Sequence, residues 1–297
     1  MRAKLDIGRG QNYDLHMHTW FCDGNDSPDT MVRAAIGKGL ETVGISGHSF
    51  TPHDTSYCMS CEGTEDYIRE IQELKETYAD KIKVLLGIEM DYYADTPSEP
   101  YDYAIGSLHY LFKGDDWTDV DDTPYKLKAF ADRHFDGDML CLAELYYETV
   151  GGIFSKTCCD IIGHFNLITK FNERFVIAPD GQVVDLRREE KPAGAEKLLD
   201  TSDPRYIAAW KGAIDRIFAD TEAAYREGWR NRLFDSEDKP VFELNTGAIS
   251  RGYRTAPYPA TDQIEYIRSR GGRLILTSDS HSEKNICFAF EEYRDLL

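Results

Sequence analysis

The amino-acid sequence predicts an α/β fold in which parallel strands, most of them followed by a helix, close into one barrel. Short apolar runs rich in β-branched residues alternate with segments whose apolar residues recur every three or four positions, as in strands and amphipathic helices. Such alternation predicts a parallel sheet, and about seven units favour a closed barrel. The 297 residues suit one large barrel or two ordinary domains. Because no linker divides them, we expect a single domain over residues 1–297.

The strands are predicted where short apolar runs stand between turn residues or helical segments. These runs are Tyr13–His18, Thr42–Ser46, Lys83–Asp91, Asp102–Leu108, Asp160–Gly163, Val241–Asn245 and Arg273–Thr277.

The helices are predicted from apolar spacing and from cap residues at their starts. Ser27-Pro28 is a start signal for a helix at Asp29–Lys38. Apolar residues three and four apart predict a second helix at Glu65–Tyr78. The further predicted helices are Pro124–His134, Asp138–Val150, Pro204–Gly228 and Thr261–Arg270.

Two segments depart from the strand–helix alternation. Gly114–Asp122 is strongly acidic and is expected to form a loop. Phe171–Asp203 has mixed charge with Pro and Gly, and its roughly thirty residues are long for an ordinary connection. We expect a loop insertion at about residues 171–203, which is either a functional lid or a solvated excursion.

Composition excludes several classes of protein. The chain has 34 Lys and Arg against 53 Asp and Glu, a formal charge of −19, so phosphate backbones would repel it and a nucleic-acid partner is not expected. No run approaches the roughly 18 apolar residues of a membrane span, and Met1–Gln11 lacks the apolar core of a signal peptide. The seven cysteines follow no disulfide spacing, which indicates a reduced, cytoplasmic protein. The oligomeric state is left open.

Histidines mark the C-terminal ends of the predicted strands. Six of the eight stand at or just beyond such ends: His16, His18, His48, His109, His164 and His281. The ends of barrel strands meet at one mouth, where active sites form. His53, in a loop near that mouth, is a candidate substrate contact, whereas His134 ends a predicted helix and is expected to be structural.

These histidines, with two carboxylates, predict a metal centre with more than one ion. Residues 16 and 18 are two apart on a strand, so both imidazoles point to the same side. Glu89 ends an apolar run and Asp279 stands two residues before His281. Imidazole and carboxylate ligands suit Zn, Mn or Fe. One catalytic metal rarely uses more than four protein ligands, so eight ligands imply two or three divalent ions.

At this point the motifs resemble a known family. D-L-H-M-H-T from Asp14, G-H-S around His48, G-I-E ending at Glu89, G-S-L-H ending at His109, G-H-F around His164 and S-D-S-H ending at His281 are similar to those of the polymerase-and-histidinol-phosphatase (PHP) phosphoesterases. Phe21-Cys-Asp-Gly24 and Glu243-Leu-Asn-Thr-Gly247 resemble its histidinol-phosphatase branch. The resemblance extends over residues 14–281 and implies a distorted, TIM-like (β/α)7 barrel with three metal ions at the C-terminal mouth of the strands.

The resemblance also implies how the ligands are shared among the three ions. The first ion would take His16, His18, Glu89 and Asp279. Glu89 would bridge to a second ion, completed by His109 and His164. The third would take His48, His281 and the residue that matches the end of the first motif. Some members of the family have a histidine there, and Asp23 is the best candidate in this chain.

The implied chemistry is hydrolysis of a phosphate monoester by a hydroxide that bridges two metals. Asp279, Glu89 and His281 are the implied catalytic residues, and Asp279 is expected to align the hydroxide. Lys170, Arg251 and Arg254 are candidates to bind phosphate oxygens, with Arg the better bidentate partner. The implied substrate is L-histidinol phosphate, in histidine biosynthesis. The alternative is another small phosphate ester, such as a nucleotide or phosphotyrosine.

Five other interpretations are less well supported. Asp119-Val-Asp-Asp-Thr123 matches the D-x-D-x-T pattern of aspartyl-phosphate phosphatases, but no apolar strand precedes it. No C-x5-R loop surrounds a cysteine, and no G-x-S-x-G elbow occurs. An amidohydrolase-like metal hydrolase would share the H-x-H motif but not the full set of motifs. A degenerate barrel without activity would lack ligands that this chain retains.

Overall fold

A parallel sheet forms the centre of the molecule in a computed structural model that describes residues 4–94 and 100–297. Within these residues its seven strands are β1 (Tyr13–Asp14), β2 (Thr42–Ile45), β3 (Lys83–Asp91), β4 (Tyr103–Ser107), β7 (Ile161–Ile162), β11 (Val241–Asn245) and β12 (Arg273–Thr277). They follow one another in that order across the sheet, and each neighbouring pair is parallel.

The first and last strands approach each other beyond the regular ladder. A parallel bridge joins Met17 to Ser280, and the amide of His18 donates to the Ser280 carbonyl oxygen over 2.8 Å. These contacts bring the two edges of the sheet together into a nearly closed barrel, which confirms the predicted fold class. The predicted first strand, Tyr13–His18, is regular only over β1, because after Asp14 a single isolated bridge, at Met17, takes the place of a continuous ladder.

Side chains along each strand point alternately into the lumen of the barrel and outward against the helices, and both sides are apolar. Leu85 of β3 and Val241 of β11 belong to one buried cluster inside the barrel, whereas their neighbours along each strand pack outward against the helices. Because side chains two and four residues apart share a face, Glu89 and Glu243 point to the same side as Leu85 and Val241. The lower part of the lumen is therefore apolar, and its upper part is polar.

Tyr103 fills the lumen below the polar layer. Its buried ring lies against Gly44 and Gly87, where an added Cβ would come within 2.2 and 2.3 Å of the tyrosine ring or hydroxyl. Its hydroxyl donates to the Leu15 carbonyl oxygen over 2.5 Å. The two glycines thus make room for the aromatic ring that supports the site above it.

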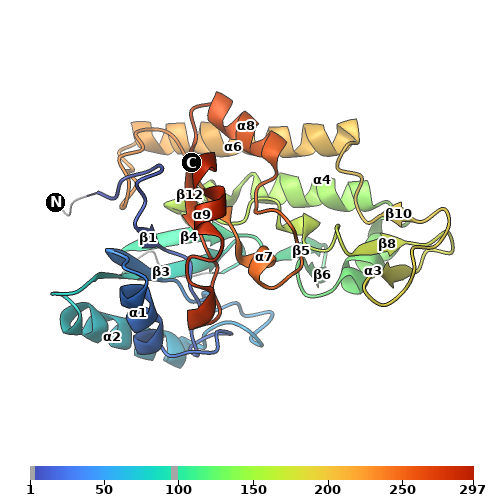
Figure 1. Cartoon of the computed structure of the whole chain (residues 1–297). Helices are drawn as coiled ribbons and strands as arrows, with labels where there is room; N and C mark the ends of the chain where they lie inside the picture. The colour runs from blue at the N-terminus through green and yellow to red at the C-terminus, as the bar shows by residue number, and fades with distance from the viewer. Residues whose placement is uncertain (1–3, 95–99) are drawn as a thin grey trace.

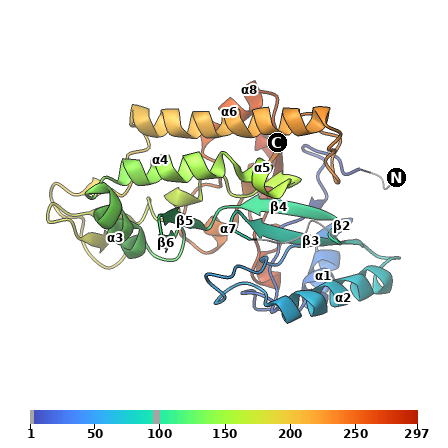
Figure 2. The same cartoon turned by 180° about the vertical axis from the view of Figure 1, so that it is seen from behind.

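Helices cover the outside of the barrel (Figures 1 and 2). They are α1 (Pro28–Gly37), α2 (Cys61–Thr77), α3 (Pro124–Phe135), α4 (Met139–Val150), α5 (Ile153–Thr157), α6 (Pro204–Arg226), α7 (Gly247–Ser250), α8 (Thr261–Ser269) and α9 (Phe290–Tyr293). Short 3-10 turns lie at Leu167–Thr169, Glu283–Asn285 and Arg294–Leu296. The long α6 lies along α4, and α1 and α2 cover the opposite side.

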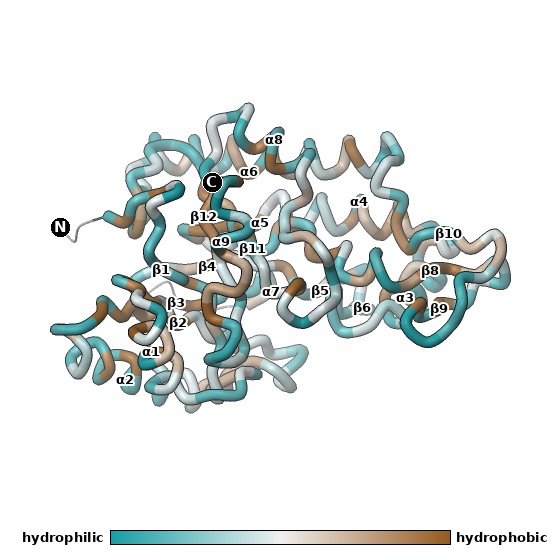
Figure 3. The backbone as a smooth tube through the Cα atoms, viewed as in Figure 1, coloured by the Kyte–Doolittle hydropathy of each residue, from teal (hydrophilic) through white to brown (hydrophobic). Residues whose placement is uncertain are grey.

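The pattern of α6 illustrates why these helices form. Tyr206, Trp210, Ala213 and Ile217 are buried at spacings of three and four, as expected for an amphipathic helix with one face on the core. Its tube accordingly changes repeatedly between brown and teal in Figure 3. None of the described helices has the length and apolar character needed to cross a membrane.

Two expectations about irregular segments need correction. Gly114–Asp122 was expected to be a loop, but β5 (Tyr110–Lys113) and β6 (Asp116–Asp119) form an antiparallel hairpin there. Phe112 and Trp117 are direct cross-strand partners, and such aromatic pairs stabilise a hairpin. The segment at residues 171–203 contains a small sheet of β8 (Phe175–Ile177), β9 (Val183–Asp185) and β10 (Glu196–Lys197), which lies at the end of the molecule away from the N-terminus (Figure 1).

Helix boundaries agree with the sequence to within about two residues, except at α2. This helix begins at Cys61, four positions before the predicted start at Glu65. The Ser60 hydroxyl accepts a hydrogen bond from the Gly63 amide over 2.9 Å, and this N-cap starts the helix before its apolar face begins.

Candidate metal centre

Side chains from both ends of the sequence meet at the C-terminal mouth of the barrel. His16 and His18 follow β1, His48 follows β2, Glu89 lies in β3, His109 follows β4, His164 follows β7, and Asp279 and His281 follow β12. All except His281 have less than 9% of their surface exposed. The parallel topology brings the predicted ligands together because every strand that carries one ends on the same side of the barrel.

Glu89 lies at the centre of this group. Its Oε1 is 2.9 Å from His164 Nε2 and 3.5 Å from His109 Nε2, and its Oε2 is 2.9 Å from His48 Nδ1, 3.2 Å from His16 Nε2 and 3.4 Å from His18 Nε2. The two oxygens of one carboxylate thus face two different sets of imidazoles. This is the geometry needed for a carboxylate that bridges two cations.

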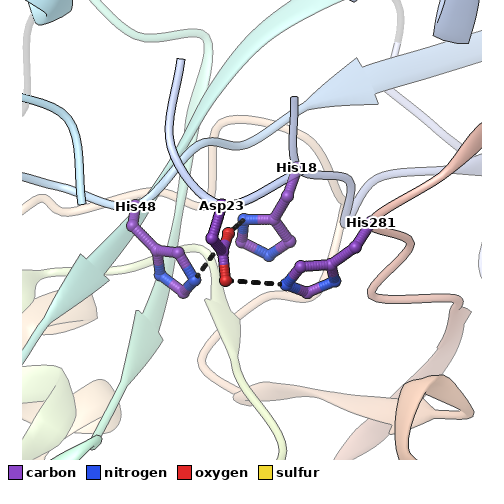
Figure 4. Close-up of side chains that lie close together, drawn as sticks. All are labelled: His18, Asp23, His48 and His281. Atoms are coloured by element: carbon purple, nitrogen blue, oxygen red, sulfur yellow. Dashed lines mark hydrogen bonds and ion pairs between the residues drawn. The ribbon is translucent and has the colours of Figure 1, made fainter. Parts of the chain in front are cut away.

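Asp23 lies at the centre of a second group, which contains three histidines (Figure 4). Its Oδ2 is 3.1 Å from His281 Nε2, and its Oδ1 is 3.6 Å from His48 Nε2 and 3.7 Å from His18 Nδ1. The residue assigned by analogy to the end of the first motif therefore lies beside His48 and His281, as the resemblance implies.

Asp279 lies close to histidines of both groups, the one around Glu89 and the one around Asp23. Its Oδ1 is 3.3 Å from His18 Nε2 and 3.8 Å from His16 Nε2, and its Oδ2 is 3.0 Å from Arg251 Nη2. Its backbone has a positive φ of 46°, which is uncommon for a non-glycine residue and typical of functional sites. A Cβ on Gly247 would lie 2.7 Å from the Asp279 Cβ, so a glycine is needed for this approach.

The donor atoms suit divalent metal ions. Three groups of ligand atoms close enough to hold an ion occur among the described residues: His16, His18 and Asp279; His48, Glu89 and His109; and His18, Asp23, His48 and His281. In particular, His16 Nε2 and His18 Nε2 are 3.1 Å apart and both lie beside a Glu89 oxygen. Buried nitrogen and oxygen donors in this arrangement fit Zn, Mn or Fe.

The electrostatics keep the carboxylates charged. Burial would raise the pKa of Glu89, but His16 and His48 hold it well below its ordinary value. Burial would likewise raise the pKa of Asp279, but Arg251 and His16 keep it well below its usual range. Both carboxylates are therefore ionised and able to bind a cation without first losing a proton.

His18 is the histidine best prepared to act as a ligand. Burial and the neighbouring His48 and His281 lower its pKa to about 3. The ring is consequently neutral at pH 7, as metal binding requires.

The candidate phosphate-binding residues line two different cavities. Arg251 and Lys170 line a pocket of about 400 Å³ over the metal centre. Arg251 also contacts His281 Nδ1 over 2.9 Å. In contrast, Arg254 lines a different cavity, where it donates to Thr169. The expectation that Arg254 contacts substrate phosphate is therefore not supported by its position.

His53 is not among the residues that line the pocket over the metal centre. Its ring packs edge-on against Tyr110 and Trp117 at centroid distances of 4.3 and 5.3 Å. His134 contacts Asp116 over 2.6 Å through Nε2, next to the turn of the β5–β6 hairpin. Its structural role was expected, whereas an aromatic setting for His53 was not.

The sequence alone did not identify an acidic wall on the outer side of the pocket. The wall consists of Asp54, Asp119, Asp121 and Asp122. Tyr57 and Tyr110 stand beside it, and Tyr57 packs edge-on against His48 at 4.7 Å. The acidic composition of residues 114–122 was the only available signal, and it did not distinguish a pocket wall from a solvated loop.

Two lysines are held against this wall. Lys170 Nζ is 3.0 Å from Asp121 Oδ2, and Lys126 Nζ is 2.7 Å from Asp119 and 2.8 Å from Asp122. Burial would raise the pKa of Asp121, but Lys170 and a nearby histidine lower it to about 2. Asp121 is thus ionised at neutral pH, and the wall as a whole sets four acidic side chains against two lysines.

The fold and the site define a barrel protein with clusters of metal-binding side chains at its mouth. The model of the PHP domain matches residues 14–246, which is most of the chain, and the chain belongs to this family.

Similar proteins of known name agree with that membership. A Deinococcus radiodurans protein named probable histidinol-phosphatase is 28% identical over 95% of this chain and 93% of its own length. The histidinol-phosphatase of Lactococcus lactis is 28% identical over 96% of this chain and 89% of its own length.

Two solved structures share the fold. One, from Listeria monocytogenes, has a TM-score of 0.70 at 17% identity and covers 95% of this chain and 99% of its own. The other is the histidinol phosphate phosphatase of Lactococcus lactis in complex with Zn, L-histidinol and phosphate. Its TM-score is 0.61 at 18% identity, covering 96% of this chain and 92% of its own. At these identities the likeness establishes the barrel architecture.

Proposed function

We propose that this protein is a metal-dependent phosphomonoesterase that hydrolyses L-histidinol phosphate to L-histidinol and phosphate. The observation that carries the proposal is the pairing of a largely buried imidazole–carboxylate centre with an acidic wall across one pocket. A small ester with a phosphate at one end and a positive charge at the other matches both sides. Membership of the PHP family and the names of the relatives support the same reaction.

The centre is proposed to hold three divalent ions. His16, His18, Glu89 and Asp279 would hold the first, and Glu89 would be shared with a second. His109 and His164 would complete the second ion, and Asp23, His48 and His281 the third. When bound, such ions lower the pKa of a coordinated water and offset the charge of phosphoryl oxygens. Zinc in the Lactococcus lactis structure supports zinc as one candidate.

The remaining chemistry belongs to side chains around the pocket. Asp279 would accept a hydrogen bond from the attacking water and orient it toward phosphorus. Arg251, already paired with Asp279 over 3.0 Å, would donate to a non-bridging phosphoryl oxygen as charge develops there. Lys170 would approach the same phosphate from the opposite side of the pocket, with its position set by Asp121.

The acidic wall is proposed to select the organic half of the substrate. Histidinol phosphate carries an ammonium group and no carboxylate, whereas the organic half of AMP is a neutral nucleoside and that of phosphotyrosine has a carboxylate beside its ammonium group. One hydrogen bond to a charged group contributes about 1.5–3 kcal/mol, or roughly 10- to 100-fold in affinity. Asp121 is the best candidate because it is ionised and faces both Lys170 and His109.

A panel of phosphate esters tests the substrate assignment. Protein reconstituted with Zn or Mn would be assayed for kcat/KM on histidinol phosphate, p-nitrophenyl phosphate, AMP and phosphotyrosine. We expect the value for histidinol phosphate to exceed each of the others by at least about tenfold. Equal values for histidinol phosphate and p-nitrophenyl phosphate would refute the assignment, although the phosphatase reaction would stand.

A wall variant separates recognition from chemistry. Asp121→Asn should raise KM for histidinol phosphate by roughly tenfold more than KM for p-nitrophenyl phosphate, because any change in the position of Lys170 affects both esters alike. Asp215→Asn is the matched control, because Asp215 is a surface carboxylate of α6 paired with Arg270. Equal losses on both substrates would assign Asp121 to the metal centre and not to recognition.

A further inference from the structure

Glu243 is a buried carboxylate in the lumen that belongs to none of the three ligand groups. It lies in β11 with 1% of its surface exposed. Its Oε1 is 2.6 Å from His16 Nδ1. Its Oε2 accepts hydrogen bonds from the His164 backbone amide over 2.9 Å and from Asn245 Nδ2 over 3.1 Å. Both oxygens are thus directed to the residues behind the metal centre.

The network determines where the His16 proton lies. A backbone amide and a side-chain amide nitrogen can only donate, so Oε2 must accept from both. A carboxylate oxygen accepts hydrogen bonds, so in the contact between Oε1 and His16 Nδ1 the ring nitrogen is the donor. The ring that binds an ion therefore keeps its proton on Nδ1 and offers the lone pair of Nε2. That nitrogen lies 3.1 Å from His18 Nε2 and 3.2 Å from Glu89 Oε2.

We propose that Glu243 is a positioning residue for the metal ion held by His16 and His18. It fixes the tautomer and the ring direction of His16 so that Nε2 is available to the ion, and it holds the His164 backbone in register with the same ring. The inference rests on the metal occupancy in the proposed function, and it does not depend on the substrate. Carboxylate–histidine–metal triads of this kind orient ligands and raise their basicity.

The neutral isostere cannot replace the carboxylate. In Glu243→Gln, the amide oxygen can face His16, but the amide NH2 then opposes the two donors at the other position. In the reverse orientation, the NH2 faces His16 Nδ1 and forces the ring proton onto Nε2, where it blocks the ion. Either orientation removes a contact that the ionised group makes, although the shape of the side chain is unchanged.

Zinc titration in competition with a chromophoric chelator gives a readout that requires no substrate. In Glu243→Gln we expect one class of bound zinc to weaken by about 10- to 100-fold. The zinc held by the group containing Asp23 should change by less than about threefold, because the altered contacts are those of His16, the His164 backbone and Asn245, and none of these residues belongs to that group. Zinc affinities unchanged in every class would overturn the proposal.

Asp160→Asn is a matched control for the loss of a buried carboxylate charge. Asp160 stands at the opposite, N-terminal end of β7 and accepts from the Ala104 amide over 2.9 Å and from Arg232 Nε over 2.8 Å. This variant should lose thermal stability but retain the zinc affinities of the wild type. If it weakens the same class of zinc as Glu243→Gln does, the effect is a general loss of stability, and the positioning role is wrong.

A measurement on the wild-type protein keeps the proposal testable even if the variant does not fold. Nitrogen-15 NMR of the zinc-loaded protein, with the His16 signals identified by their absence in His16→Gln, reports the protonation of each ring nitrogen. We expect His16 to retain a proton on Nδ1 and to bind zinc through Nε2. Zinc on Nδ1 would overturn the inference. A positive result together with absent phosphatase activity would leave the inference intact and refute the proposed function instead.

Discussion

Replacement of Glu89 by glutamine is the most decisive perturbation of the metal centre. The variant keeps the size of the side chain and removes one negative charge. Five histidines have a ring nitrogen within 3.5 Å of the two Glu89 oxygens. If the carboxylate bridges two ions, both should lose affinity together, whereas a purely structural carboxylate would affect neither.

The magnitude follows from the charge removed. Two unit charges about 4 Å apart interact by roughly 4 kcal/mol at an effective dielectric of about 20. A loss of this size weakens binding of each bridged ion by about 10³-fold. Turnover should fall by at least the same factor, because hydrolysis needs both ions. The fold should persist, because Glu89 contacts the ligand histidines and lies above the apolar core of the lumen.

Metal analysis and steady-state kinetics measured on the same preparations test the prediction. We expect wild-type protein to retain its zinc after gel filtration, and Glu89→Gln to lose the two classes of zinc that share this residue. Asp160→Asn, which removes a buried charge away from the centre, should keep both metal and activity. If Glu89→Gln retains a full metal complement and wild-type kcat, Glu89 is not a bridge and the assignment of the centre is wrong.

Three further outcomes follow. Burial alone would lower the pKa of His109, but neighbouring carboxylates raise it to about 9. Zinc binding at pH 7 should therefore release a proton from His109, and binding above pH 9 should not. Calorimetry in buffers of different ionisation enthalpy measures the number of protons released. Arg251→Ala should lower kcat/KM by about 10²- to 10³-fold, while Arg254→Ala should change it by less than about tenfold. Gly87→Ala should lose about 1–3 kcal/mol in urea unfolding because its Cβ would meet the Tyr103 ring.

Strands could be predicted from the sequence where a short run of residues is enough to define them. Lys83–Asp91, Val241–Asn245 and Arg273–Thr277 have the predicted bounds, because each is a short apolar run between turn or charged residues. The meeting of the histidines could also be predicted, since parallel strands end on one side of a barrel. Neither inference required knowledge of which residues are in contact.

The rest of the site depends on geometry that the sequence does not encode locally. Arg251 and Arg254 are three residues apart, yet they line different cavities, because the chain turns at Gly252 with φ of 70°. Glu243 and His16 are in contact across 227 positions, and no spacing rule relates them. The wall carboxylate Asp121 lies beyond a hairpin whose aromatic cross-strand pair was not recognised.

The acidic side chains of the pocket wall are expected to orient the substrate. A phosphate dianion would be repelled by the wall, and an ammonium group would be repelled by a loaded metal centre, so each half of an amino-phosphate ester has one acceptable end of the 400 Å³ pocket. Charge alone therefore determines the orientation of such a substrate before any shape complementarity applies. After hydrolysis, phosphate remains attracted to the metal centre, whereas the amino alcohol is held only by the wall. The alcohol should consequently leave first, and inorganic phosphate should inhibit competitively against the ester. Noncompetitive inhibition by phosphate would show that the metal centre and the substrate phosphate occupy different parts of the pocket.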